Sequence, residues 1–394
     1  MADESPLLPV TVISGFAGAG KSALVQHLVA QAGGRHVHVL ANEELGAAQG
    51  CLCCSLREDL RDEVRRLAED GHCDYLLIES GAAAEPQPVA ELFTFEDEHG
   101  ESLADVARLD TLVTVVDAES FLSDWQSEDD LRARGAAVDE GDERSVSDLL
   151  VEQIEFANVL VLSKLDRVSA EDAELIQALL RQLNPEAQIV AVPQGAVPVD
   201  AVMGTGLFDF EQTEQAPGWL AALRGEPAPA DEEHGLGSFV YRARVPFHPQ
   251  RFWDLLSDTA TWSGVLRSKG FFWLATRMAV SGLWSHAGGS AMCEAAGSWY
   301  AALPPAQWPE EPEQAEQIRE DWQEPWGDRR QEIAFMGVEL DESVIRAKLD
   351  SALLTEQELA GGTSQWAELN DPFPDWPGHE PAPELEDAGC PPLS

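Results

Sequence analysis

Apolar and helix-like stretches alternate along the first half of the chain. Short runs of β-branched residues indicate buried strands, and apolar positions three and four apart indicate amphipathic helices between them. Residues 22–32 and 55–69 carry the helical patterns. This alternation is typical of a mostly parallel sheet wrapped by helices. The predicted strands span residues 10–13, 37–41, 75–78, 112–116, 159–162 and 189–192.

The pattern changes after residues 216–237, a stretch of turn residues and charges without periodicity, which we interpret as a linker. Only Trp125 of the twelve tryptophans precedes this linker. Beyond it, strand-like segments accompany the aromatic residues, and a helical pattern covers residues 341–354. We therefore expect a small α+β domain with a mainly antiparallel sheet. Its predicted strands span residues 239–244, 270–276, 298–302 and 332–338.

The chain length supports a division into two domains and a tail. One hydrophobic core rarely serves a chain of 394 residues. The last stretch is rich in Pro and Glu and has no apolar pattern, so we expect it to be disordered. The predicted organisation is an α/β domain over residues 1–215, the linker over 216–237, an α+β domain over 238–376 and the tail over 377–394.

Residues 15–22 fit the pattern of a phosphate-binding loop, and they lie directly between a predicted strand and a predicted helix. That context makes a chance glycine-rich turn a weak alternative and predicts a P-loop NTPase domain. Backbone N–H groups and the helix N-terminus would face the phosphates, Lys21 would neutralise the β and γ oxygens, and Ser22 would offer its hydroxyl to Mg²⁺. The predicted nucleotide-binding residues here are Gly15, Gly18, Ala19, Gly20, Lys21 and Ser22.

The predicted strand 159–162 is followed by Ser163-Lys164-Leu165-Asp166. In GTPases an Asn-Lys-x-Asp sequence follows the corresponding buried strand, and its Asp accepts hydrogen bonds from the guanine N1 and N2 donors. We therefore predict that Ser163, Lys164 and Asp166 bind guanine, with Ser replacing Asn. The alternative is a helix-entry loop in which Asp166 lies near a cap.

Glu79 follows the predicted strand 75–78, at the strand end where P-loop proteins place a carboxylate near Mg²⁺. We predict that Glu79 and Lys21 are the catalytic residues of the site. A solvated strand-end acid is the alternative interpretation of Glu79.

Three of the six cysteines crowd into residues 51–54. Adjacent cysteines are poorly placed for ordinary disulfides, so in a reducing compartment the cluster indicates metal ligation rather than buried or redox cysteines. The N-terminus of the next predicted helix favours thiolates, which bind Zn²⁺ and related ions. Three sulfurs leave one tetrahedral position open, which suits a metal in transit. The predicted thiolate ligands are Cys51, Cys53 and Cys54, and the candidates for the open position are Glu43, Glu44, His36 and His38.

Acidic residues dominate the charge of the chain, with 71 Asp and Glu against 25 Lys and Arg and a net charge of −46. We interpret this surface as a halophilic adaptation, because salt near 1 M shortens the Debye length to about 3 Å and screens the repulsion. The same field repels phosphate backbones and anionic lipid, which argues against nucleic-acid and membrane partners. The sequence shows no signal-peptide pattern and no long apolar run, so we expect a cytoplasmic protein.

Together, these motifs resemble those of the CobW family of metal-linked GTPases, in particular the branch proposed to act as zinc chaperones. The resemblance covers roughly residues 8–376. It rests on Ser14-Gly15-Phe16, Gly50-Cys51-Leu52-Cys53-Cys54, Ile78-Glu79-Ser80, Glu85-Pro86, Val115-Val116-Asp117-Ala118, Gly204-Thr205-Gly206-Leu207-Phe208-Asp209-Phe210, Phe239-Val240-Tyr241-Arg242-Ala243-Arg244, Gly270-Phe271-Phe272-Trp273-Leu274-Ala275 and Asp328-Arg329-Arg330-Gln331-Glu332.

The resemblance implies that the cysteine motif binds Zn²⁺ or Co²⁺ and that GTP is hydrolysed slowly to GDP with Mg²⁺. It also implies that the second domain is the family's C-terminal domain, for contact with a partner or client metalloprotein. The chain departs from the family at three points. The segment before the cysteine motif is short, Ala82 stands where the family has glycine with Gly81 one residue early, and Ser163 replaces Asn. We expect nucleotide binding to survive these departures and switching to be affected by them.

The leading hypothesis is a GTP-dependent metallochaperone or metal insertase in which hydrolysis controls metal transfer to a client protein. One alternative is a metal-buffering protein that binds nucleotide but barely hydrolyses it. The other is a small-molecule P-loop kinase, for which a Cys-x-Cys-Cys motif has no evident use. The sequence leaves the physiological metal, the client and self-association open.

Overall fold

The structure is a computed structural model. It describes residues 7–41, 55–96, 100, 102–137, 142, 144–192, 196–227, 230–231, 233–309 and 312–376. The chain forms two compact units, of which the first comprises Met1–Ala221 with Gly288–Ser290 and the second comprises Ala222–Ala287 with Ala291–Ser394. In the described ranges, no helix combines the length and the apolar character needed to cross a membrane.

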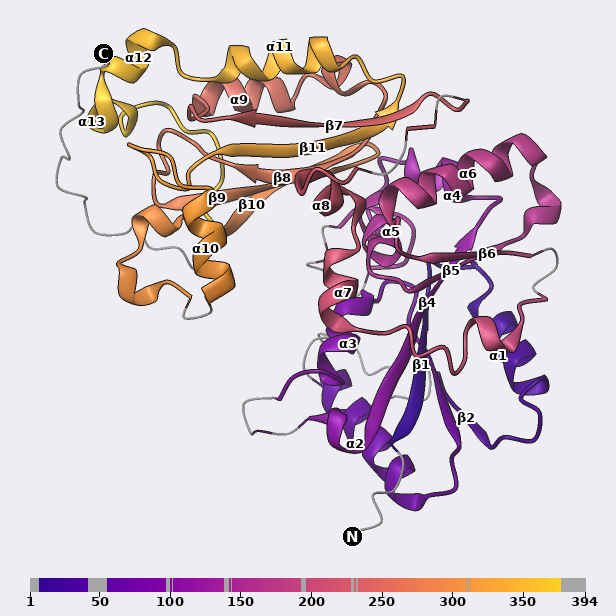
Figure 1. Ribbon diagram of the computed structural model, residues 1–394. Helices are drawn as coiled ribbons and strands as arrows, with labels where there is room; N and C mark the ends of the chain where they lie inside the picture. The colour runs from indigo at the N-terminus through magenta and orange to yellow at the C-terminus, as the bar shows by residue number, and fades with distance from the viewer. Residues whose placement is uncertain are drawn as a thin grey trace. The chain divides into compact units, whose positions relative to one another are not determined.

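The first unit is built on a six-stranded sheet in the order β2-β3-β1-β4-β5-β6 (Figure 1). All neighbouring strands in it pair in parallel. The strand β1 lies between β3 and β4 in the sheet. The chain leaves the carboxyl end of β1 toward one edge of the sheet and that of β4 toward the other edge. Ligand sites of parallel sheets usually lie at such a point. The strands are β1 (Leu8–Ser14), β2 (Val37–Ala41), β3 (Tyr75–Glu79), β4 (Ala107–Asp117), β5 (Val159–Ser163) and β6 (Gln188–Ala191).

The helices of the first unit follow the strands. Their end residues match the sequence signals for helix starts: Ser145, Ser169 and Asp209 each accept a hydrogen bond from the first turn of the helix that follows. The helices are α1 (Lys21–Ala30), α2 (Ser55–Asp70), α3 (Pro86–Leu92), α4 (Phe121–Trp125), α5 (Val146–Glu155), α6 (Ala170–Leu183), α7 (Phe210–Gln215) and α8 (Gly218–Leu223).

Apolar cores cover both faces of this sheet. On one face, α1 packs with residues of β1, β3, β4 and β5, and Val202 and Met203 join the same core. On the other face, α2 and α3 pack against β1, β3 and β4, and Phe208 and Phe210 contact that core. The chain between Val202 and Phe208 therefore passes from one core to the other.

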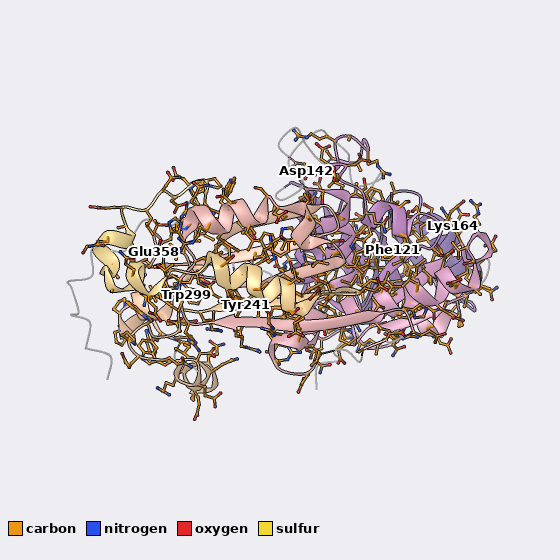
Figure 2. The ribbon with its side chains drawn as sticks, turned by 90° about the horizontal axis from the view of Figure 1, so that it is seen from above. Phe121, Asp142, Lys164, Tyr241, Trp299 and Glu358 are labelled. Atoms are coloured by element: carbon orange, nitrogen blue, oxygen red, sulfur yellow. The ribbon has the colours of Figure 1, made fainter. Side chains whose placement is uncertain are left out.

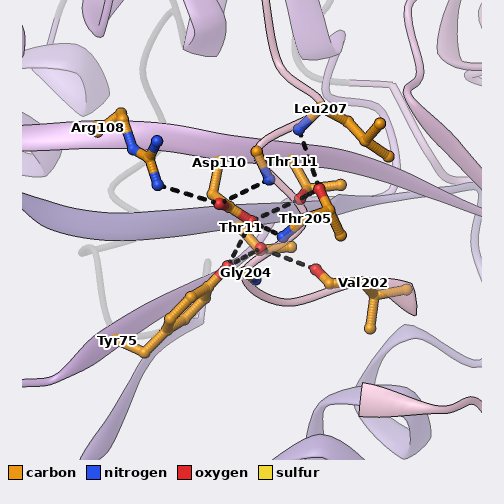
Figure 3. A network of polar contacts seen from close by, with 10 residues as sticks. Thr11, Tyr75, Arg108, Asp110, Thr111, Val202, Gly204, Thr205 and Leu207 are labelled. Atoms are coloured by element: carbon orange, nitrogen blue, oxygen red, sulfur yellow. Dashed lines mark hydrogen bonds and ion pairs between the residues drawn. The ribbon is translucent and has the colours of Figure 1, made fainter. Parts of the chain in front are cut away.

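A polar network fixes this passage near the amino ends of β3 and β4, and we call it the amino-end network (Figure 3). It consists of Thr11, Tyr75, Asp110, Thr111 and Thr205. Asp110 is an extra residue at a β-bulge, since β1 pairs Val10 with Leu109 and Thr11 with Thr111. Its carboxylate accepts hydrogen bonds from the Tyr75 hydroxyl at 2.9 Å, the Thr111 hydroxyl at 2.8 Å and the Thr205 N–H at 2.9 Å.

The second unit is an antiparallel five-stranded sheet in the order β10-β9-β8-β11-β7. The helices α9 and α11 lie along one face of it (Figure 1). The strands are β7 (Leu236–Ala243), β8 (Val265–Phe272), β9 (Val280–Ala287), β10 (Ser290–Ser298) and β11 (Gln331–Val338). The helices are α9 (Pro249–Leu256), α10 (Pro312–Glu320), α11 (Glu342–Ala352), α12 (Glu356–Ala360) and α13 (Gly362–Trp366).

Aromatic side chains form the core between this sheet and its helices. Phe247 and Phe252 stack with ring centroids 4.2 Å apart, and Trp284 and Phe335 lie in the same buried cluster. The hydroxyl of Tyr241 donates to the Asp350 carboxylate of α11 at 2.8 Å, which ties the helix to β7 (Figure 2). The tryptophan-rich composition of this half of the chain therefore serves packing.

The predicted fold class is confirmed: a parallel α/β sheet is followed by a separate α+β unit with an antiparallel sheet. Two local predictions were wrong. The stretch 216–237 contains α8 and the start of β7, because Trp219 and neighbouring alanines are buried there. The predicted strand 298–302 is mostly a 3₁₀ turn, since β10 ends at Ser298. The strand β9 and the helix α9 were not predicted. The tail 377–394 lies outside the described residues.

Candidate functional site

The phosphate-binding loop leaves the carboxyl end of β1 and enters α1, as its sequence predicts. Gly15 adopts a φ of +136° and lies so close to β4 that a Cβ would overlap the carbonyl oxygen of Val115. Gly18 and Gly20 also have positive φ values, of +77° and +104°. These conformations are open to glycine and costly for other residues, so the glycines of the motif are required by the backbone itself.

Lys21 begins α1 and is almost completely buried, with 9% of its surface exposed. Its ammonium donates to the carbonyl oxygen of Gly15 at 2.5 Å and to that of Phe16 at 3.2 Å. Burial lowers the pKa of Lys21, and the nearby carboxylate of Glu79 partly offsets this effect. Two bonds leave one of the three ammonium donors for a phosphate oxygen.

Ser22 and Glu79 meet at the ends of α1 and β3. The Ser22 hydroxyl donates to a carboxylate oxygen of Glu79 at 2.6 Å, although the two residues are 57 positions apart in the sequence. A hydroxyl and a carboxylate beside a phosphate loop are oxygen ligands of the kind that Mg²⁺ prefers. The structure therefore brings together the residues that we predicted to hold Mg²⁺, and this donor set fits the ion.

The loop after β5 contacts the phosphate-binding loop through Ser163. Its hydroxyl lies 2.8 Å from the carbonyl oxygen of Ala19 and 3.1 Å from that of Val116. Lys164 has a φ of +54°, and its ammonium contacts the carboxylate of Asp117 at 2.6 Å. Asp166 lies in the following 3₁₀ turn and is exposed.

These contacts show how the loop is held, and the guanine-binding roles stay predictions. Ser163 joins the loop to Ala19 through its hydroxyl, so the replacement of Asn keeps a link between the two loops. We did not predict Asp117 as a site residue, although it belongs to the motif Val115-Val116-Asp117-Ala118 and is the last residue of β4. The signal was present, because β4 and β5 are parallel neighbours and Asp117 pairs with Ser163.

The loop after β3 carries Ala82, and side chains from α5 and the residues before it hold this loop. Gln153 donates through its amide nitrogen to the carbonyl oxygens of Ala82 at 3.2 Å and Ala84 at 3.0 Å. Arg144 donates to the carbonyl oxygen of Ala83 at 3.3 Å and forms an ion pair with Glu85. The sequence analysis missed Gln153 and Arg144, because no motif links them to the loop.

The predicted thiolates Cys51, Cys53 and Cys54 and the candidate ligand Glu43 lie outside the described residues. Within the described ranges, no group of three or more His, Cys, Asp and Glu side chains is arranged to hold a metal ion. His36 precedes β2, where its N–H donates to Asp74 at 2.7 Å. The metal site therefore stays a prediction from the sequence.

Comparison with known proteins identifies the family. Residues 9–47 and 44–191 match the model of the CobW/HypB/UreG nucleotide-binding domain, and residues 236–353 match that of the cobalamin synthesis protein cobW C-terminal domain. The chain is 39% identical to the zinc-regulated GTPase metalloprotein activator 1 of Dictyostelium discoideum, over 93% of this chain and 84% of that protein. It is 30% identical to the zinc chaperone Rv0106 of Mycobacterium tuberculosis, over 89% of this chain and 84% of that protein.

Among solved structures, the chain matches the Zn(II)-bound YjiA GTPase from E. coli with a TM-score of 0.40, 18% identity and coverage of 89% of this chain and 100% of that chain. The two domain matches and the relatives of similar length agree with the motifs along the sequence. The chain therefore belongs to the CobW family, with the family's nucleotide-binding domain followed by its C-terminal domain.

Proposed function

We propose that this protein is a GTP-hydrolysing metallochaperone that binds Zn²⁺ through Cys51, Cys53 and Cys54 and delivers it to a client metalloprotein. Relatives named as a zinc-regulated GTPase metalloprotein activator and as a zinc chaperone support this role. Co²⁺ is the second candidate metal. The observation that carries the proposal is the pairing of β2 with β3, because it connects the phosphate site to the cysteine segment.

The strand β2 ends at Ala41, which pairs with Glu79 in the parallel sheet. The chain that leads to the cysteines therefore departs from a point beside the carboxylate that receives the Ser22 hydroxyl. The helix α2 begins at Ser55, immediately after Cys54. A segment bounded by the phosphate site and by a helix N-terminus can change when the nucleotide changes, as switch segments of GTPases do.

The nucleotide site would supply the charge stabilisation that GTP hydrolysis requires. Lys21 and the N-terminus of α1 stabilise negative charge on the phosphates. Ser22 and Glu79 would hold Mg²⁺, which neutralises the charge that develops on the transferred phosphate. Asp166 would accept the two donors of the guanine edge. In this proposal slow hydrolysis to GDP changes the metal affinity of the cysteine segment.

A metal-buffering role without useful hydrolysis is the second candidate. The motivating observation is the length of the connecting segment, since only nine residues lie between Ala41 and Cys51. A buffering protein should bind Zn²⁺ equally well with GTP and with GDP. A nucleotide that does not distinguish two states of the metal site cannot shift the affinity of that site for Zn²⁺.

Metal titration of the purified protein at high salt separates the two roles. Zn²⁺ affinity is measured without nucleotide, with GDP and with a non-hydrolysable GTP analogue. We expect the GTP-analogue and GDP states to differ by about tenfold, a coupling free energy of about 1.4 kcal/mol. Equal affinities in all three states would exclude coupling and support buffering.

Serine variants identify the ligands in the same titration. We expect Cys53→Ser to weaken Zn²⁺ binding and Cys73→Ser to leave it unchanged. Cys73 is a matched control, because it lies outside the motif in the sequence and its thiol already donates to the backbone oxygen of Tyr75 at 3.1 Å. Equal loss in both variants would contradict the assignment of the motif as the metal site.

A further inference from the structure

The backbone of the loop after β3 is held by side-chain donors at three consecutive residues. The carbonyl oxygens of Ala82 and Ala84 accept from Gln153, and that of Ala83 accepts from Arg144. Loop carbonyls usually bond to backbone or water, so three side-chain bonds in succession indicate that this conformation is specifically maintained.

These bonds set the direction of the loop's N–H groups. In a trans peptide the C=O and the N–H point in opposite directions. Because the Ala82 carbonyl faces Gln153, the N–H of Ala83 points away from it. Within the described part of the chain, the N–H groups of Ala82 and Ala83 donate no hydrogen bond, whereas the N–H of Ala84 donates to Gly81.

The loop also borders the phosphate site. Ser80 follows Glu79, and its N–H donates to the carbonyl oxygen of Ile13 at 3.0 Å, next to the start of the phosphate-binding loop. Ala83 packs in one apolar cluster with Phe16 of that loop and with Val146 of α5. One helix thus supports both the phosphate-binding loop and the loop after β3.

Gln153 and Arg144 are themselves firmly held. Gln153 is completely buried, and its backbone oxygen accepts from the Thr114 hydroxyl at 2.6 Å. Arg144 makes two hydrogen bonds of 2.9 Å to the carboxylate of Asp142. The two side chains that hold the loop are therefore fixed in place before any ligand arrives.

We propose that Gln153 and Arg144 are positioning residues that orient the Ala82–Ala84 loop so that its N–H groups recognise the terminal phosphate of GTP. The loop then distinguishes GTP from GDP although Ala82 stands where the family has glycine. The inference rests on the proposed GTPase function and adds the residues that make the site sensitive to the third phosphate.

The test compares nucleotide affinities of the full-length Gln153→Met variant with those of wild type, at high salt with Mg²⁺. Methionine keeps the length of the side chain and removes both donors. We expect affinity for a non-hydrolysable GTP analogue to fall about tenfold and GDP affinity to change by less than about twofold. A general structural defect would instead lower both affinities together.

The matched control is Gln177→Met in α6, where the amide donates to Ala173 of the same helix at 3.1 Å. We expect this variant to bind both nucleotides like wild type. Arg144→Lys, which keeps the charge but loses the planar fork, should show the same selective loss at about threefold. If Gln153→Met fails to fold, the Arg144→Lys variant tests the positioning role by itself.

The inference is overturned if the Gln153 and Arg144 variants lose GTP-analogue and GDP affinity equally, or if neither affinity changes. Failure of the proposed function is a separate result, because wild type would then bind no GTP analogue at all. A selective loss in wild-type-like folded protein supports the inference.

Discussion

The two ends of the six-stranded sheet use polar residues in opposite ways. At the amino ends of β3 and β4, the groups of the amino-end network satisfy one another: Tyr75 contacts Thr11 and Asp110, and Asp110 receives four hydrogen bonds from hydroxyl and backbone donors. At the carboxyl end of β1, Lys21 retains a donor, and the exposed Asp166 accepts no hydrogen bond from the described residues.

The titration behaviour of the two ends follows the same division. Burial raises the pKa of Asp110, but hydrogen bonds from Thr111, Tyr75 and the backbone outweigh it and hold this pKa below its ordinary value. Burial lowers the pKa of Lys21 although the carboxylate of Glu79 partly offsets it, so a bound phosphate would further stabilise the charge of Lys21. A polar group whose donors and acceptors are all paired stabilises the fold, whereas one with an unused hydrogen-bond donor or acceptor is available to a ligand.

Of the changes considered at the two ends of the sheet, replacing the buried Lys21 should have the largest effect, and this effect is on nucleotide binding. We expect Lys21→Ala to weaken nucleotide binding at least about 1,000-fold, roughly 4 kcal/mol, because it removes the charge-assisted phosphate contact. Zn²⁺ binding without nucleotide should be retained, since the lysine contacts no thiolate in the proposed site. Calorimetric titrations with nucleotide and with Zn²⁺ measure both, and loss of both in a folded variant would contradict separate sites.

At the other end of the sheet, Asp110→Asn should destabilise the fold by about 3 kcal/mol, because an amide cannot accept every donor that faces the carboxylate. Nucleotide affinity should stay unchanged. Urea unfolding at high salt and a nucleotide titration measure the two effects. A large loss of nucleotide affinity in the folded variant would show that the amino-end network serves the ligand.

The same variant gives a pH test. The pKa of Asp110 is lowered in the folded protein, so its stabilising contribution is complete above the unfolded pKa of about 3.9 and is lost as pH falls through the folded value. The stability difference between wild type and Asp110→Asn should therefore be largest near neutral pH and shrink below pH 4. A difference that is constant with pH would mean that the charge of Asp110 is unimportant.

The smallest of these effects concerns base recognition. We expect Asp166→Asn to reduce the preference for GTP over ATP about tenfold, roughly 1.4 kcal/mol, because an amide mismatches the paired donors of guanine. The stability of the fold should not change, since Asp166 is exposed. Competition binding with both nucleotides measures the preference, and a wild type that binds them equally would refute the assignment of the loop after β5.

The sequence predicted the conformation of the glycine-rich loop because its signals are local. A glycine-rich turn between a strand and a helix specifies the backbone conformation by itself, and the structure has positive φ at Gly15, Gly18 and Gly20. The runs of β-branched residues likewise predicted the parallel sheet. The strand β10 was not predicted, because its small residues carry little β-propensity and all of its residues are exposed or only partly buried.

Contacts between distant segments could not be predicted in this way. Asp110 accepts hydrogen bonds from residues 35 and 95 positions away. Its orientation depends on a β-bulge, which no pattern in the sequence predicts. Gln153 is likewise separated from Ala82 by 71 positions. A glutamine on an amphipathic helix looks the same in sequence whether it faces water or a loop carbonyl.

The sequence by itself thus determined the family, the order of the domains and the conformation of the phosphate-binding loop. These features depend on residue type at short spacing, which a linear sequence displays directly. Only the tertiary structure decided which polar groups pair with one another and which keep capacity for a ligand. That distinction depends on the distance and direction between side chains from separate elements, which the packing of the sheet and its helices sets.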